Sequence, residues 1–294
     1  MIITIKDSSL CASIDTMGAQ LISLKDNQEK EYIWQRDPQI WMRCSPLLFP
    51  VVGNCRNDKT IINGKWYTMP KHGFCKDMEF SVIKQSESSV SLFLSYTRDT
   101  LEHYPYKFGI TLTYTVSESA LSIIYRPENF QEDPMPFFLG AHPGFRCPLN
   151  DGERFDDYQL LFDQEESTSS MVYDLTSLEF DPEKAGITLK NTHVLSLSYN
   201  IFQNDAVFFE KIHSRKVSLI HKISGKGIQV DFPNFQSIAF WTCVHPEAPF
   251  LCIEPWNGSG IRKDEDDEFI HKHGIQILDG NQSSEYFLQI RILK

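Results

Sequence analysis

Two titratable residues follow apolar runs, where a buried strand would carry them into the interior. In Phe250–Trp256 (FLCIEPW), Glu254 directly follows four apolar residues. In Phe137–Phe145 (FFLGAHPGF), His142 likewise follows an apolar run. A carboxylate in such a place must be paired, hydrogen-bonded or shifted in pKa, because burying it bare is costly. An imidazole titrates near pH 6.5 (about its unperturbed pKa), which suits it to proton transfer. A structural salt bridge or a core histidine would also explain each residue alone.

Two further segments place polar side chains beside Gly or Pro. Pro70–Phe74 (PKHGF) contains His72 and is followed closely by Lys76, and Pro50–Arg56 (PVVGNCR) is an apolar strand that ends at Arg56. A guanidinium is a rigid fork of donors for hydroxyls, carboxylates or phosphate, although a surface arginine is the commoner case. Taken together, the four segments predict a general acid and a general base in one cleft, as proton transfer on a neutral substrate requires.

Other catalytic chemistries have weaker support in the sequence. It contains no G-x-S-x-G nucleophile elbow, no G-x-G-x-x-G and no phosphate-binding loop, so we expect no nucleotide cofactor. His271 and His273 form an H-K-H without the further ligands of a metal site, so we expect no metal there. The acidic run Lys263–Glu268 (KDEDDE) reads as a solvated loop.

Composition and charge restrict the partners and the compartment. The net charge is −11 and the pI is about 5.3, which argues against nucleic-acid binding but leaves room for one small anionic substrate. The seven cysteines form no C-x-x-C pair, which favours reduced thiols. The start, MIITIKDSSL, is unlike a signal peptide, and no apolar run is long enough for a transmembrane helix. We therefore expect a soluble, cytoplasmic protein.

The hydrophobic pattern predicts an all-β protein. Alternation with period two predicts strands, Asn63-Gly64 predicts a hairpin turn, and one short helical turn is expected at Asp99–His103 before Pro105. The more polar Asp151–Asn191 is expected to form loops and short strands. No linker is visible, so residues 1–294 are expected to form a single domain. The alternating segments are Ser89–Arg98, Phe108–Val116, Ala120–Tyr125, Lys216–Ile220 and Tyr286–Ile292.

The order of the motifs resembles a known family. PVVGNCR, NGKWYTMPKHGFCKDMEFSV, GAHPGF and CIEPWNG follow one another as in the galactose mutarotase-like (aldose 1-epimerase) superfamily, and most resemble its branch of LacX-like mutarotase-related proteins. The resemblance implies a β-supersandwich of large twisted antiparallel sheets with an open cleft. It also implies an isomerase that interconverts the α and β anomers of a free aldose without a cofactor or metal.

The resemblance also implies a role for each motif residue. Glu254 matches the base that takes the proton from the C1 hydroxyl, and His142 matches the acid that protonates the ring oxygen. His72 matches a histidine near the reacting centre, and Arg56 matches an arginine that holds sugar hydroxyls. Asp205, in QNDAVFF, resembles more loosely an aspartate that grips distal hydroxyls.

Alternatives remain open from the sequence. Hexose-6-phosphate 1-epimerases are similar too, but often show H-G-F-A-R where this chain has H-G-F-C-K, with Lys76 in place of that arginine. Arg56, Lys71 and Lys76 would then hold the phosphate. Further alternatives are a carbohydrate-binding protein without catalysis and a glycoside hydrolase that pairs Glu254 with another carboxylate, Asp205 or Asp231. The expected partner is a small sugar, and the expected state is a monomer or a weak homodimer.

Overall fold

The alternating segments form strands because each can bury one face and leave the other polar. A computed structural model describes residues 1–294. In β9 (Phe108–Ser117) and β24 (Tyr286–Leu293), buried residues alternate with more exposed ones almost throughout. All five predicted segments are strands. Asn63 and Gly64 turn the hairpin with positive φ angles of 52° and 73°, as a type I′ turn requires. These predictions are confirmed.

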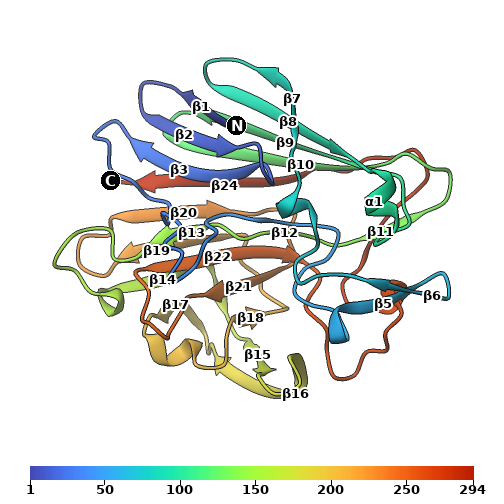
Figure 1. Ribbon diagram of the computed structural model, residues 1–294. Coiled ribbons are helices and arrows are strands. Elements are labelled where there is room, and N and C mark those ends of the chain that lie inside the picture. The colour runs from blue at the N-terminus through green and yellow to red at the C-terminus, as the bar shows by residue number, and fades with distance from the viewer.

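Two large antiparallel sheets make up most of the fold (Figure 1). The first has nine strands, in the spatial order β17 (Thr192–Ser196), β14 (Tyr158–Glu166), β19 (Lys216–His221), β20 (Gly227–Asp231), β24, β10 (Ala120–Asn129), β9, β8 (Ser89–Ser95) and β7 (Ser81–Gln85). The second runs β16 (Glu179–Thr188), β15 (Ser169–Asp174), β18 (Val207–Phe209), β21 (Ser237–Trp241), β22 (Phe250–Asn257), β12 (Leu139–Ala141) and β4 (Leu47–Leu48), and β13 (Gly144–Arg146) also pairs with β22.

A continuous apolar cluster of 79 buried residues joins the sheets to the smaller elements. The ring of Phe162 in β14 lies 6.0 Å from that of Phe240 in β21 and 6.5 Å from that of Phe209 in β18, so the large sheets meet face to face. This is the β-supersandwich that the sequence predicted. Smaller sheets are formed by β1 (Ile2–Lys6), β2 (Leu10–Asp15) and β3 (Gln20–Asp26), by β5 (Lys59–Ile62) and β6 (Lys65–Thr68), and by β11 (Met135–Phe137) and β23 (Gln276–Leu278).

Helical structure is limited to short turns. The predicted helical turn exists as α1 (Arg98–Leu101), which begins after the capping residue Thr97. The 3₁₀ turns are η1 (Arg56–Asp58), η2 (Cys75–Asp77), η3 (Phe155–Asp157), η4 (Tyr199–Phe202) and η5 (Phe269–His271). None of these helices has the length and apolar character needed to cross a membrane.

The region from Asp151 to Asn191 is more regular than predicted. It contains β14 and the paired strands β15 and β16, which belong to the two large sheets. The pairing of β15 with β16 shifts register twice, beside Met171, and β16 leaves Glu183–Gly186 exposed. The bulges and the exposed residues break the period-two pattern, which explains why the sequence suggested only short strands.

The acidic run is the loop that the sequence suggested, but it is only partly solvated, since Lys263, Asp264 and Asp266 are exposed and the other three residues are partly covered. Residues 260–268 lie between β16 and β5, because Phe180 N–H donates to Ile261 O at 2.9 Å and Ile61 N–H donates to Asp267 O at 2.8 Å. We call residues 260–268 the acidic strap. Glu265 within it is buried and pairs with the buried Lys272, with 3.5 Å between carboxylate and ammonium.

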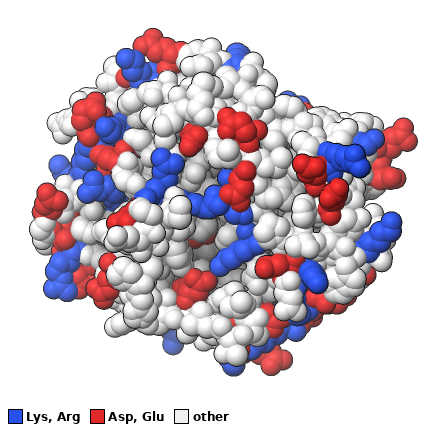
Figure 2. Space-filling model, viewed as in Figure 1, with Lys and Arg blue, Asp and Glu red and all other residues white.

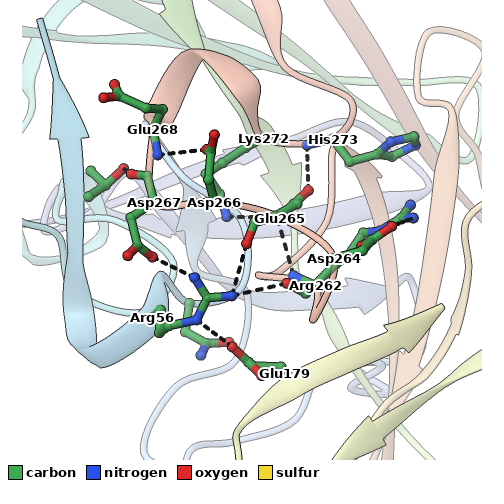
Figure 3. Close-up of polar contacts among 12 residues, drawn as sticks. Arg56, Glu179, Arg262, Asp264, Glu265, Asp266, Asp267, Glu268, Lys272 and His273 are labelled. Atoms are coloured by element: carbon green, nitrogen blue, oxygen red, sulfur yellow. Dashed lines mark hydrogen bonds and ion pairs between the residues drawn. The ribbon is translucent and has the colours of Figure 1, made fainter.

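Arg56 anchors the acidic strap (Figure 3). Its Nε donates to Glu179 of β16 at 2.6 Å, and its Nη1 donates to Asp267 at 2.6 Å. Its Nη2 donates to the carbonyl oxygens of Arg262 at 3.3 Å and Glu265 at 3.1 Å. All three guanidinium nitrogens are therefore bonded within the protein, and a single side chain ties β16 to the strap.

We expect Arg56→Met to lower the free energy of unfolding by roughly 1–3 kcal/mol, because two partly buried carboxylates and two carbonyls lose their donor. Chemical denaturation measures the change. Arg154→Met is the matched control, since Arg154 pairs with Asp156 at 2.7 Å but its side chain is 76% exposed. The control should stay within about 0.5 kcal/mol of wild type. Equal effects in the two variants would show that Arg56 does not anchor the strap.

Candidate functional site

The pairing of β22 with two short strands brings Glu254 and His142 together. Gly140 of β12 is opposite Trp256, and Gly144 of β13 is opposite Cys252. His142 lies midway between those glycines in the chain, just as Glu254 lies midway between their partners. A hydrogen bond from Ile253 N–H to Pro143 O, at 3.1 Å, holds the connection against β22. Strand register therefore sets the two side chains face to face.

The two side chains form a buried contact. His142 Nε2 lies 3.3 Å from Glu254 Oε2, and the residues are only 7% and 1% exposed. Around His142, the rings of Trp41 and Trp241 lie 5.1 Å and 5.9 Å away, centre to centre. The pair thus sits in an apolar, largely dry wall, where electrostatic interactions are strong and charge is costly.

Burial moves the pKa values of the pair in opposite directions. Desolvation raises the pKa of Glu254 well above its ordinary value, and Asp205 adds to the rise. Desolvation lowers the pKa of His142 to about 3. Both shifts favour the uncharged side chain. The state that burial favours therefore has one proton on Glu254 and a neutral His142, with 3.3 Å between their facing atoms.

His72 is held as a neutral hydrogen-bond donor. Its Nδ1 accepts from Gly53 N–H at 3.0 Å, which leaves Nε2 to carry the proton. Burial, with His142 adding to it, lowers the pKa of His72 well below the ordinary histidine value. The backbone of His72 has a φ of 65° and donates to Gly53 O at 2.6 Å. Gly53 must be glycine, since a Cβ there would lie 2.3 Å from Gly260 Cα.

Asp205 approaches the same space from the loop before β18. Its backbone φ is 69°, a left-handed conformation that is uncommon outside glycine and is seen at functional sites. Its carboxylate Oδ2 lies 3.8 Å from the Lys71 ammonium, which comes from the His72 loop. The ion pair therefore links two segments that are far apart in the sequence.

These residues line one cavity of about 360 Å³, within the range of small-molecule sites. The face shown in Figure 2 is hollowed near its centre, over the β21–β22 region, where Lys, Arg, Asp and Glu side chains meet at the rim. Glu254, His142, His72, Asp205 and Lys76 of the predicted residues are part of the lining. The others are Trp41, Arg43, Pro46, Gly53, Asn54, Lys71, Tyr173, Phe180, Ala206, Trp241 and Trp256.

Two predicted binding residues have their polar atoms engaged by the protein itself. Arg56 does not line the cavity, because its guanidinium turns to Glu179 and the acidic strap. In this structure Arg56 therefore lies outside the lining in which the sequence placed it as a ligand for sugar hydroxyls or phosphate. Lys76 does line the cavity, but its ammonium donates to the carbonyl oxygens of Lys71 and Gly73. It closes the turn that carries His72.

Sequence reasoning missed several lining residues. Arg43 lines the cavity, whereas Arg56 does not, and it pairs with Asp77 at 2.5 Å. Asn54 also lines it, and its amide is fixed by donating to Leu178 O at 2.8 Å. Asn54 stands inside the PVVGNCR motif and could have been found there. Arg43 follows the aromatic Trp41 in a segment with no recognisable pattern.

One cluster of potential metal ligands overlaps the site. The ligand atoms of His142, Cys252 and Glu254 all lie within 4.8 Å of one another. Burial raises the pKa of the Cys252 thiol well above its ordinary value, so the sulfur is a neutral thiol and not the thiolate that binds metals. His271 and His273 turn to different carboxylates, Asp266 at 2.8 Å and Glu210 at 2.9 Å, and form no shared site.

The chain is similar in sequence and in structure to known proteins. The sequence profile described as aldose 1-epimerase matches residues 1–273. The plasmid-encoded protein LacX of Lactococcus lactis subsp. lactis is 36% identical over 265 residues, which is 88% of each chain. The structure of a galactose mutarotase related enzyme from Lactobacillus acidophilus superposes with a TM-score of 0.93 at 27% identity, over 100% of this chain and 98% of that one.

A galactose mutarotase-like protein from Lactobacillus casei is similar to the same degree, with a TM-score of 0.91 and 27% identity over the full length of both chains. The profile match covers more than nine-tenths of the residues, and the relatives share the two-sheet architecture. Family and fold support a sugar epimerase or mutarotase type of role. The chain belongs to the aldose 1-epimerase family.

Proposed function

We propose that the protein is an aldose 1-epimerase, which interconverts the α and β anomers of a free hexose. The observation that carries the proposal is the contact between Glu254 and His142 inside the cavity. Opening a hemiacetal ring requires one proton to leave the C1 hydroxyl and one to reach the ring oxygen. A carboxylate and an imidazole that share a single proton can perform both transfers.

The reaction balances on these two residues. The ionised Glu254 takes the proton from the C1 hydroxyl while the protonated His142 gives its proton to the ring oxygen. The bond from C1 to the ring oxygen breaks, and the open chain carries an aldehyde at C1. After rotation about the C1–C2 bond the same steps run in reverse, and the ring closes on the other face of the aldehyde.

The protons of the pair fit this cycle. A proton on Glu254 and a neutral His142 are what burial favours, and they are also the state that follows ring opening. Before a closed sugar can react, the proton must pass from Glu254 to His142. The distance between Glu254 Oε2 and His142 Nε2 is 3.3 Å. The low dielectric of the site thereby lowers the energy of the open-chain complex relative to the charged pair.

The remaining polar residues would hold the sugar. His72 offers its Nε2 proton next to His142, since the two rings are 5.6 Å apart. Asp205 can accept hydrogen bonds from hydroxyls farther from C1, and Asn54 adds an amide. Trp41 and Trp241 present ring surface, which suits the apolar faces of a pyranose.

A sugar phosphate is the second candidate substrate. The observation in its favour is that Arg43 and Lys71 line the cavity in a chain of net charge −11. A guanidinium binds phosphate in a bidentate manner, and Arg43 occupies the place that sequence reasoning gave to Arg56. A protein that binds sugars of this shape without catalysis would keep the cavity but show no turnover.

Glu254→Gln and His142→Asn should each reduce the rate of mutarotation by about 10²–10⁴-fold, because each removes one of the two proton transfers. The optical rotation of freshly dissolved α-glucose or α-galactose decays to its equilibrium value, and the rate of this decay above background is measured. Glu285→Gln is the control, since that residue is exposed and does not line the cavity. Wild-type rates in both site variants would rule out the assignment.

The pH profile of kcat/KM should be flat through neutrality. His142 takes up a second proton only near its lowered pKa of about 3, so activity persists well below the pH at which an ordinary histidine titrates. The raised pKa of Glu254 keeps the single proton on the pair until the pH exceeds that pKa, and activity falls when that proton is lost. Background-subtracted polarimetry, with circular dichroism to verify folding, tests this. A step between pH 6 and 7 would contradict it.

Arg43→Met separates the two candidate substrates. For a free hexose we expect kcat/KM to change less than about threefold, because a hydroxyl needs no full positive charge. For glucose 6-phosphate or galactose 6-phosphate we expect a loss of about 10–100-fold, as for a lost charged hydrogen bond. Arg43→Lys, which retains the charge, is the control. Faster wild-type turnover of the phosphate, lost in Arg43→Met, would favour the second candidate.

A further inference from the structure

The indole N–H of Trp256 is a buried donor without an acceptor. Trp256 is 3% exposed and lines the cavity, and its Nε1 has no hydrogen-bond partner. A buried N–H without a partner costs free energy comparable to a lost hydrogen bond. Such a donor, aimed into a site, is expected to find its acceptor during the reaction.

An unpartnered acceptor lies on the same strand. Glu254 and Trp256 are two residues apart on β22, so their side chains emerge on the same face of the sheet. Oε2 of Glu254 faces His142, whereas Oε1 is buried and has no partner. The donor and the acceptor are therefore neighbours, and both belong to the lining of the cavity.

The ring of Trp256 is fixed, so the carboxyl group is the part free to adjust. The ring lies 5.3 Å from that of Phe208 and 6.0 Å from that of His72. On the remaining side it rests on Gly140, where a Cβ would come within 2.8 Å of Trp256 Cδ1, the ring atom bonded to Nε1. Glycine at that position gives the edge that bears the N–H its room.

We propose that Trp256 is a positioning residue for the base, whose N–H donates to Oε1 of Glu254 when that carboxylate is ionised. The proposal rests on the proposed function of the Glu254–His142 pair and adds a member to it. Oε2 then receives the proton from the C1 hydroxyl, while Oε1 is held by the indole. Both oxygens have a distinct task, and the carboxylate is kept in one orientation.

The proposed hydrogen bond opposes the effect of burial on the pKa of Glu254. A donor that bonds the ionised form of an acid favours that form. The nearby Trp256 side chain accordingly lowers the pKa of Glu254, against the larger effect of desolvation that raises it. Trp256 thus makes the charged state of the base accessible inside an apolar wall.

Trp256→Phe removes the N–H and keeps a flat apolar ring. We expect kcat for mutarotation to fall by about 10–100-fold, the value of a charged hydrogen bond, with KM changed less than about threefold. The alkaline limb of kcat should move to higher pH, because Glu254 now holds its proton more tightly. The acidic limb, which reports His142, should not move.

Trp241→Phe is the matched control, since it removes the same ring area from the cavity wall beside His142. Its alkaline limb should coincide with that of wild type. A lower kcat in Trp256→Phe with an unmoved alkaline limb would reduce the role of Trp256 to packing. A raised KM with an unmoved limb would mean that the N–H binds the sugar. Either result overturns the proposal.

A second measurement does not depend on turnover. Because folding raises the pKa of Glu254, stability is lost as pH rises from the ordinary carboxyl pKa through the raised one. In Trp256→Phe this loss of stability should continue to higher pH. When Glu254→Gln is introduced into wild type and into Trp256→Phe, neither protein should show the loss. Absence of mutarotation in wild type with this pattern intact would refute the proposed function alone. Absence of the pattern would refute the role of Trp256.

Discussion

The cost of placing a carboxyl group in an apolar wall governs the rest of this structure. Glu254 is 1% exposed and has no cation in contact, so the protein keeps it by letting it hold a proton. His142 is the titratable group that contacts its carboxyl oxygen at 3.3 Å, and burial drives that imidazole towards its neutral form. A pair with these two preferences carries one proton and can pass it either way, which is what reversible ring opening requires.

The surrounding fold holds this pair in an apolar wall. Every residue of β22 is buried, which is unusual for an antiparallel strand, since such sheets commonly leave one face in water. The strained backbones of His72 and Asp205 bring polar side chains to the same cavity from separate loops. Conformations of this kind persist only where neighbouring structure over-determines them, and here hydrogen bonds to Gly53 do so for His72.

Much of the fold and the two central residues of the site could be read from the sequence, for identifiable reasons. The alternating pattern made β9 and β24 recognisable because each strand has one buried face. The hairpin at Asn63-Gly64 was recognisable from local backbone preference alone. Glu254 and His142 were visible because apolar strands lead into them. Their contact, however, depends on the register of β12 and β13 against β22, which is a long-range property that no local pattern encodes.

Arg56 shows where the sequence signal ends. The residue type and its place after an apolar strand suit a substrate ligand, but two non-glycine residues that follow it, Asn57 and Asp58, have φ angles of 53°. This turn directs the guanidinium to Glu179 and to the acidic strap, whose own carboxylates would otherwise repel one another. Once those acidic residues are present, the strongest available pairing for Arg56 is with them and not with a neutral sugar. The cavity is left with Arg43 as the guanidinium in its lining.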